Sequence, residues 1–233
     1  MIASKKAKPV DPLLVVLGPT ASGKTHLAVE VARTLKGEIL SADSRQVYRG
    51  LDIGSGKDLQ EYGEVPCHLI DLVGPDVEFS LFDFVRAYCE AVERVRAAGR
   101  LPIVVGGTGL YLDAILRDYA LVEAPLNQEL RCTLEGKSLE ELRTHLLSLR
   151  TEQHNRTDLD DRERLVRAIE IATANLNGTA ARIEVPKIAS RVYGLRWPRE
   201  QLRQRIVRRL KERLDAGLIE EVAGLHAAGV SWQ

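Results

Sequence analysis

The sequence predicts an α/β protein in which helices cover a parallel sheet and a helical insertion interrupts the core. Three observations support this: short apolar runs alternate with amphipathic stretches, glycine-rich turns follow several of the runs, and leucines at helical spacing dominate the middle of the chain. Strands that alternate with helices form parallel sheets. We therefore divide the 233 residues into a polar tail (1–12), an α/β core (13–116 plus 187–233) and an insertion (117–186).

The elements of the core follow from the apolar pattern. The first strand leads through a glycine-rich loop into a helix that ends near Gly37 and carries Leu27, Val31 and Leu35 on one face. We expect further strands at Glu38–Ser41, Cys67–Asp71, Leu101–Val105 and Ile188–Leu195, after the first at Leu13–Leu17. We expect further helices at Leu81–Ala98, Arg199–Ala216 and Ile219–Ala228.

Leucines set the pattern of the insertion. Helical spacing relates Leu139, Leu142, Leu146 and Leu149, and the same spacing relates Leu165, Ile169 and Ala172. Two amphipathic helices are therefore expected there.

The loop after the first strand fits the phosphate-binding pattern G-x-x-x-x-G-K-[ST], which makes the predicted core P-loop NTPase-like. Its main-chain N–H groups, the Lys24 cation and a helix N-terminus would hold a di- or triphosphate, and the Thr25 hydroxyl could ligate Mg²⁺. The candidate residues are Gly18, Pro19, Thr20, Ala21, Ser22, Gly23, Lys24 and Thr25.

Two other strand ends should converge on this loop, because ligands of parallel sheets lie beyond the carboxyl ends of the strands. Asp43 would act there as a general base, hold Mg²⁺ through water, or only cap a turn. Asp71 is a rival metal ligand. The Thr108 hydroxyl in Gly106–Gly109 would donate to a phosphate oxygen, unless these glycines simply form a tight turn.

Charge, cysteine content and the absence of a targeting pattern indicate the cellular compartment and the kinds of ligand site to expect. The formal net charge is zero, so a nucleic-acid site would have to come from local clusters of basic residues. Cys67, Cys89 and Cys132 are widely spaced, which favours a reducing compartment over disulfides or a zinc site. No signal peptide or membrane span is indicated. We expect a cytoplasmic monomer without a membrane partner.

Basic residues cluster in two places. Most of those in the predicted helix Arg199–Ala216 are expected at a solvated surface, but Arg205 and Arg209 lie four residues apart and could clamp an oxyanion. A second group in the insertion could contact a nucleic-acid backbone: Arg131, Arg156, Arg162, Arg164 and Arg167.

Six segments, in this order, closely resemble the tRNA dimethylallyltransferases. They cover most of the chain, and the block from Asp43 to Gly54 (Asp-Ser-x-Gln-Val-Tyr-x-Gly-x-Asp-Ile-Gly) is far more specific than the phosphate loop. The segments are Gly18–Thr25, Ala42–Gly54, His68–Asp71, Phe79–Phe84, Gly106–Tyr111 and Asp161–Glu170.

The resemblance implies transfer of the dimethylallyl group of dimethylallyl diphosphate to N6 of adenosine 37, in tRNAs that read codons starting with U. Asp43 would be the general base, with Thr108 and Arg209 beside it in catalysis. Lys24, Thr25, Thr108 and Arg209 match residues that hold the diphosphate, with Arg205 close by. Mg²⁺ is expected together with the diphosphate, with Thr25 as its predicted ligand. Residues that match contacts with the tRNA anticodon stem-loop are Asp43, Ser44, Arg45, Gln46, Arg131, Glu163, Arg164, Leu165, Val166 and Arg167.

Two departures from the family pattern are visible. Members usually continue past the position of Gln233 with further helices, so we expect a fragment or a shortened member. The insertion also lacks sequence between Arg131 and Leu139, so we expect its helices to be short.

Other functions remain open at this stage. An adenylate dimethylallyltransferase would modify free AMP, ADP or ATP with a similar core, although it would not need the basic insertion. A small-molecule P-loop kinase would use ATP, with Asp43 as base. A chain without activity would only bind RNA or diphosphate.

Overall fold

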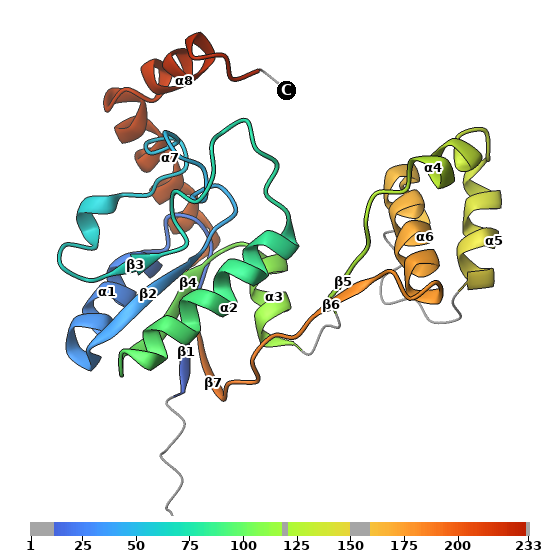
Figure 1. The fold of residues 1–233 in the computed structure, drawn as a ribbon. Helices are drawn as coiled ribbons and strands as arrows, with labels where there is room; N and C mark the ends of the chain where they lie inside the picture. Colours follow the sequence, from blue (N-terminus) through green and yellow to red (C-terminus); the bar gives the residue numbers. More distant parts are fainter. Residues whose placement is uncertain (1–11, 118–120, 150–158, 232–233) are drawn as a thin grey trace, which may run out of the picture. The chain divides into compact units, whose positions relative to one another are not determined.

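The computed structural model describes residues 12–117, 121–149 and 159–231, so Arg156 and nearly all of the predicted polar tail lie outside the described residues. The chain forms two compact units. The first comprises the residues up to 119 together with 185–233, and the second comprises 120–184 (Figure 1).

A five-stranded parallel sheet is the centre of the first unit. Its strand order is β3-β2-β4-β1-β7. The strands are β1 (Leu13–Leu17), β2 (Gly37–Ala42), β3 (Cys67–His68), β4 (Leu101–Gly106) and β7 (Ser190–Gly194). The predicted α/β class with a parallel sheet is therefore confirmed.

Helices cover both faces of this sheet. On one face, α1 (Lys24–Leu35) packs on Val16, Ile39 and Ile103. Neighbouring strand positions such as Leu40 and Val104 are also buried and point to the other face, where α2 (Leu81–Ala97) packs on β2 and β4. Beside α2 lies α3 (Gly109–Leu116), a helix that the sequence pattern did not indicate.

Of the three residues predicted on one face of the first helix, Val31 packs against the core, whereas Leu27 and Leu35 do not. Leu27 and Leu35 are 39% and 53% exposed, whereas Ala28, Val29 and Ala32 are at most 2% exposed. Small side chains at the contact let the helix backbone lie close to the sheet, so α1 packs through alanine and valine instead of leucine.

The strand predicted at Cys67–Asp71 is also shorter than expected. It ends at His68, because Leu69 and Asp71 adopt left-handed backbone conformations with φ of 67° and 57°. The chain turns away from the sheet there, so Asp71 does not lie in line with a strand end.

Three strand ends lie level at the carboxyl edge of the sheet. Gly106 is paired with Leu17 of β1 on one side and with Ala42 of β2 on the other. A Cβ atom at Gly106 would collide with the Ala42 carbonyl oxygen, so only glycine allows these strands to approach at this point. The register places the loops that begin at Gly18, Asp43 and Gly107 side by side.

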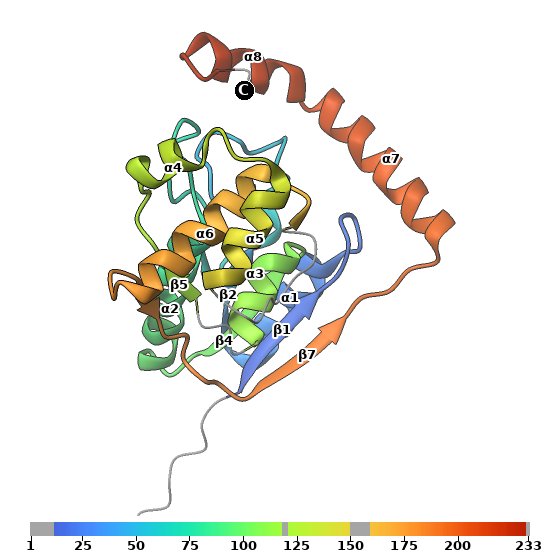
Figure 2. The ribbon, with the colours of Figure 1, turned by 90° about the vertical axis from the view of Figure 1, so that its right-hand side faces the viewer.

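The chain passes from the edge strand β7 into α7 (Arg199–Asp215) and α8 (Leu218–Ala227), as Figure 2 shows. Both helices begin and end within one residue of the predicted positions. In α7, which is described throughout, no residue is buried. This helix is therefore attached to the core through polar contacts and not through an apolar face.

The second unit has a small apolar core of its own. It contains α4 (Gln128–Leu134), α5 (Leu139–Leu149), α6 (Arg162–Leu176) and an antiparallel pair, β5 (Leu121–Glu123) with β6 (Ala181–Ile183). Leu142, Leu146 and Leu165, from the predicted leucine pattern, are at most 2% exposed in this core. Across the described residues, no helix is long and apolar enough to cross a membrane.

One carboxylate organises the polar side of this second core. Glu170 is 2% exposed, accepts hydrogen bonds from Arg131 at 2.7 and 2.9 Å and from Arg167 at 2.9 Å, and also accepts from the Asn127 N–H at 3.1 Å. These donors lower the pKa of Glu170 to about 2, although burial alone would raise it.

We predict that Glu170 stabilises the second unit in a pH-dependent way. Its folded-state pKa is about 2 and its ordinary value is 4.5, so the stabilisation is complete above pH 4.5 and is lost as the pH falls towards 2. At pH 7 Glu170→Gln should lower the free energy of unfolding by up to about 3 kcal/mol, and this difference should shrink towards zero at low pH. Urea titrations followed by circular dichroism measure it.

The control variant is Glu163→Gln, on the same helix but exposed, which should change stability little at any pH. A stability difference between wild type and Glu170→Gln that stays constant from pH 7 to pH 3 would contradict the prediction.

Candidate functional site

The phosphate loop has the backbone arrangement that anion binding requires. Helix α1 begins at Lys24 after Gly23, which has a φ of 84°, and no side chain caps its first turn. The N–H groups of that turn are therefore available to a ligand. The Ser22 hydroxyl is also buried without a hydrogen-bond partner among the described residues, as expected where a ligand supplies the missing partner.

The three strand ends bring the predicted reactive side chains together. Thr108 Oγ1 accepts a hydrogen bond of 3.0 Å from the Ser44 N–H, and the Thr108 N–H donates to the Ala42 carbonyl at 3.3 Å. The backbone of Gly107 approaches Lys24, since a Cβ atom there would lie 3.7 Å from Lys24 Nζ. The loops after β1, β2 and β4 thus form one site.

Asp43 lies half-buried in this site. One carboxylate oxygen accepts a 3.0 Å hydrogen bond from the Arg45 N–H, so Asp43 does cap a turn. The other oxygen has no hydrogen bond from a described residue, and it is therefore available to accept a proton. Turn capping and a general-base role are compatible here, because they use different oxygens.

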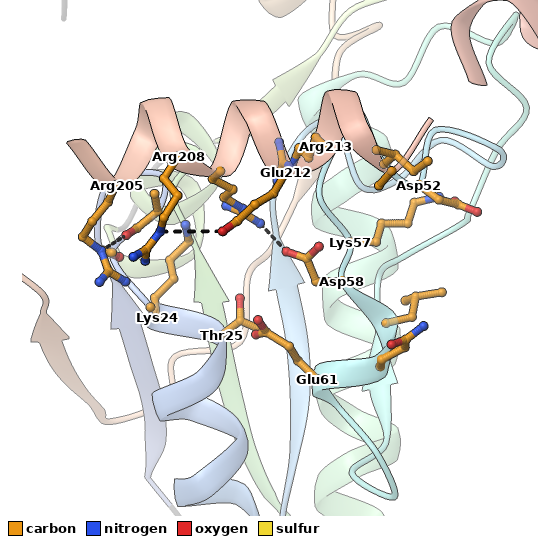
Figure 3. A pocket seen from close by; sticks show the side chains of 18 residues that line it. Lys24, Thr25, Asp52, Lys57, Asp58, Glu61, Arg205, Arg208, Glu212 and Arg213 are labelled. Atoms are coloured by element: carbon orange, nitrogen blue, oxygen red, sulfur yellow. Dashed lines mark hydrogen bonds and ion pairs between the residues drawn. The ribbon is translucent and has the colours of Figure 1, made fainter. Parts of the chain in front are cut away.

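A cavity of about 700 Å³ extends from the phosphate loop along α7 (Figure 3). Six cationic side chains line it: Lys24, Lys57, Arg205, Arg208, Arg209 and Arg213. Four carboxylates also line it: Asp52, Asp58, Glu61 and Glu212. Cations are in excess, so the cavity suits an anionic ligand.

The arginines of α7 are held in place individually. Arg205 Nε donates to the Ala21 carbonyl at 2.7 Å, and its guanidinium lies 4.4 Å from the centre of the Trp197 ring. Arg209 forms an ion pair with Asp58. The predicted clamp residues Arg205 and Arg209 therefore both line the cavity, fixed by neighbours before any ligand binds.

Arg213 occupies the far end of the same helix face. Its Nη2 lies where a Cβ atom of Gly56 would be, and Gly56 has a φ of 64°. Burial and the nearby Arg209 lower the pKa of Arg213, and burial likewise lowers the pKa of Lys24 while the charge of Asp43 opposes that change. The cavity thus concentrates incompletely neutralised positive charge.

Asp71, considered as a rival metal ligand, has a structural role instead. It pairs with Lys57, whose side chain is fully buried and also contacts Asp52 at 2.5 Å and the Tyr48 carbonyl at 2.8 Å. A buried lysine needs such partners, so this carboxylate is committed to it.

Several residues predicted to contact tRNA are engaged inside the protein. Gln46 is 8% exposed; its side-chain oxygen accepts a hydrogen bond from the Ser41 hydroxyl, and its side-chain nitrogen donates to the Gly56 carbonyl. Leu165 is fully buried. Val166 packs on the core of the second unit. These three side chains are engaged in the fold, and contact with tRNA at these positions stays a prediction.

The basic cluster of the insertion is likewise used internally. Arg131 and Arg167 bind Glu170, and Arg167 also donates to the Ala124 carbonyl at 2.7 Å. Arg162 donates to the carbonyl of Leu134, the last residue of α4, and to that of Lys137. Glu163, Arg164 and Arg45 are exposed and remain candidates for contacts with tRNA.

Sequence reasoning missed Arg213, Lys57 and Asp58 as parts of the site. Arg213 extends the four-residue spacing of Arg205 and Arg209, so the periodicity could have identified it. Lys57 and Asp58 follow the glycines at positions 54 and 56, a turn signal whose position in space the sequence does not specify.

Comparisons with known proteins agree on one family. Family models described as IPP transferase and isopentenyl transferase match residues 46–233 and 12–64. A tRNA dimethylallyltransferase 2 of Syntrophotalea carbinolica is 57% identical over 94% of this chain and 74% of its own length. A tRNA dimethylallyltransferase of Treponema pallidum is 54% identical, over 94% of this chain and 72% of its own.

The similar solved structures are enzymes of the same kind. The full-length tRNA isopentenylpyrophosphate transferase of Bacillus halodurans has a TM-score of 0.65 and 32% identity, with 95% of this chain and 72% of that chain covered. A eukaryotic dimethylallyltransferase acting on tRNA has a TM-score of 0.75 and 25% identity, with 93% and 56% covered.

We predict that Gly56→Ala destabilises the protein by more than a left-handed backbone position alone explains. Gly99 has a φ of 68° and open space within 4 Å of the place that a Cβ atom would take, so Gly99→Ala is the control. That control should cost about 1–2 kcal/mol, and Gly56→Ala should cost more because it displaces Arg213. Thermal unfolding followed by circular dichroism compares them.

The double variant Gly56→Ala/Arg213→Ala separates the two causes. Relative to Arg213→Ala, the added alanine should cost less than it does in the wild type. Any cost that remains above that of Gly99→Ala comes from Arg209, whose Nη2 would lie 2.7 Å from the new Cβ atom. An equal cost of Gly56→Ala with and without Arg213 would show that the contact is unimportant.

Proposed function

The chain belongs to the IPP transferase family, and on that premise we propose that it transfers the dimethylallyl group of dimethylallyl diphosphate to N6 of adenosine 37 in tRNA, releasing diphosphate. The observation that carries this proposal is the meeting of a phosphate loop, Asp43 and Thr108 at one sheet edge, next to a cavity lined by arginines.

The leaving group would occupy the phosphate loop. As the bond between the allylic carbon and the diphosphate oxygen breaks, negative charge grows on that oxygen. The first turn of α1, Lys24, Arg205 and Arg209 supply positive charge around this position, and the Thr108 hydroxyl can donate to a phosphate oxygen. Groups fixed before the reaction stabilise such charge without reorganisation.

The nucleophile would approach from the Asp43 side. The N6 lone pair of adenine is delocalised into the ring, so N6 gains nucleophilicity only as it loses a proton. The nitrogen–carbon bond forms, the carbon–oxygen bond breaks, and the N6 proton passes to the Asp43 oxygen that does not bind Arg45. The products are N6-dimethylallyladenosine and diphosphate.

The tRNA substrate imposes a further step. A base stacked in an anticodon loop cannot reach a site at the edge of a sheet, so the adenosine must leave the stack. Arg45, next to Asp43, and Glu163 and Arg164 at the start of α6 are exposed and suited to contact the anticodon stem-loop. These contacts are part of the proposal.

Magnesium would fit the phosphate loop through one side chain and the ligand itself. Among the described residues no group of three or more His, Cys, Asp or Glu side chains could hold a metal. Thr25 lines the cavity with a hydroxyl, the kind of oxygen ligand that Mg²⁺ accepts. We propose that Thr25 and diphosphate oxygens hold Mg²⁺, which would neutralise charge on the diphosphate.

The competing functions have less support. The named relatives act on tRNA, which does not favour an enzyme for free adenine nucleotides. A phosphoryl-transferring P-loop enzyme usually holds Mg²⁺ with an acidic residue after a buried strand, and β4 is followed by Gly107 instead.

We predict that radioactive label in the dimethylallyl group enters unmodified tRNA that carries an adenosine at position 37. In a parallel reaction with AMP, label should stay in the diphosphate. The label is counted after precipitation of the RNA and chromatography of the nucleotides. Preferential label transfer to AMP would favour an adenylate dimethylallyltransferase, and a phosphorylated product made from ATP would favour a kinase.

We further predict that Asp43 acts mainly in the chemical step, whereas Lys24 acts mainly in diphosphate binding. Asp43→Ala should reduce label transfer at least about 100-fold while diphosphate affinity stays within about threefold, because a general base contributes to the chemical step. Lys24→Ala should weaken diphosphate affinity at least about tenfold, because it removes a cation from the loop. Calorimetry with diphosphate gives the affinities.

Lys211→Ala is the matched control for Lys24→Ala, since Lys211 is exposed on α7 and is not among the residues that line the large cavity. Its diphosphate affinity should equal that of wild type. Unchanged affinity of Lys24→Ala would remove the loop from the site.

A further inference from the structure

Three consecutive backbone amides converge on one carboxylate far along the chain. The N–H groups of Asp52 and Ile53 donate to Glu221 Oε2 at 2.8 and 2.7 Å, and the Gly54 N–H donates to Glu221 Oε1 at 2.9 Å. Successive N–H groups that point into one concavity form an anion site. Here the anion is a side chain of α8, so the contact joins α8 to the 51–58 loop.

The 51–58 loop is itself tied to the catalytic edge. The buried Lys57 side chain anchors the loop through contacts with Asp52, Asp71 and the Tyr48 carbonyl. Gln46 donates to the Gly56 carbonyl at 3.0 Å. The loop therefore has a fixed position relative to the segment that begins at Asp43, and whatever binds the loop is positioned against that segment.

Two arginines of α7 rest on this loop. Arg213 packs on Gly56 and donates to the Gly54 carbonyl at 3.4 Å, and Arg209 forms an ion pair with Asp58. At the other end of α7, Trp197 donates to the Ser22 carbonyl at 2.9 Å and Arg205 donates to the Ala21 carbonyl. Arg209 lies between these two attachments.

The contact between Glu221 and the 51–58 loop contributes to the position of α7. No residue of α7 is buried, so apolar packing of α7 itself contributes little to its position. In α8, Leu218 lies against Gly54 beside the Glu221 contact. Hydrogen bonds to a charged acceptor are stronger than those between neutral groups, and Glu221 makes three of them.

We propose that Glu221 is a positioning residue for diphosphate binding: it fastens the α7–α8 segment to the 51–58 loop and thereby holds Arg209 over the cavity. This inference rests on the proposed function, because it assumes that diphosphate is the anion that Arg209 meets. Glu221 itself is not among the residues that line the cavity and acts only through the arginine.

Glu220 provides the matched control. It lies in the same first turn of α8 and carries the same charge, so it interacts equally with the helix dipole. It is exposed, and it is not an acceptor for the three amides of the loop. A difference between Glu221→Gln and Glu220→Gln therefore reports on the loop contact.

The test is a double-mutant cycle with diphosphate as the ligand. Calorimetry measures the dissociation constant for wild type, Glu221→Gln, Glu220→Gln, Arg209→Ala and Glu221→Gln/Arg209→Ala. We expect Glu221→Gln to weaken binding about tenfold, which corresponds to about 1.4 kcal/mol, and Glu220→Gln to change it less than about twofold. Without Arg209, Glu221→Gln should add less than about twofold.

Hydrogen exchange gives a second measurement that needs no ligand. In Glu221→Gln the amides of residues 52–54 and of α7 should exchange faster, whereas those of β1 and β4 should not change. If Glu221→Gln melts below the assay temperature, Glu221→Asp, whose carboxylate is one methylene shorter, replaces it in both measurements.

The outcomes separate the two proposals. Equal weakening by Glu221→Gln with and without Arg209 would overturn the positioning role, as would equal effects of Glu221→Gln and Glu220→Gln. Failure of wild type to bind diphosphate, or normal binding by Arg209→Ala, would overturn the proposed function of the cavity and the positioning role with it.

Discussion

The site depends on the register in which β1, β2 and β4 end together. Leu17, Ala42 and Gly106 lie level across the sheet, and a side chain at Gly106 would collide with the Ala42 carbonyl. Because the strands end at one level, the phosphate loop, Asp43 and Thr108 begin at neighbouring points. A slip of one residue would reverse the face of every side chain in the strand and separate these groups.

A second layer of organisation comes from charge. The sheet and its covering helices are held by apolar packing, whereas α7 reaches the core through guanidinium groups, a tryptophan N–H and, beyond its end, a carboxylate of α8. Cationic side chains brought together around a cavity repel each other, and Asp58 and Glu212 offset part of this repulsion by pairing with Arg209 and Arg208. An anionic ligand would offset the remainder.

The elements whose signals are local could be predicted from sequence. The phosphate loop, the alternation of strands and helices, and the bounds of α2, α7 and α8 follow from apolar period and turn residues. The partners of polar side chains could not be predicted, because they come from distant segments. Gln46, Arg131 and Arg167 resemble ligand-binding residues in sequence, yet Ser41, Gly56 and Glu170 bind them inside the fold. Likewise, Asp71 resembles a metal ligand in sequence, yet it forms an ion pair with the buried Lys57.

The lack of buried residues in α7 has a consequence for the conditions in which the protein works. Coulomb attraction between partly exposed groups fades as dissolved ions accumulate, over a Debye length of about 8 Å at physiological ionic strength. Apolar packing has no such dependence. We therefore expect concentrated salt to weaken the attachment of the arginine-bearing helix more than the packing of the core.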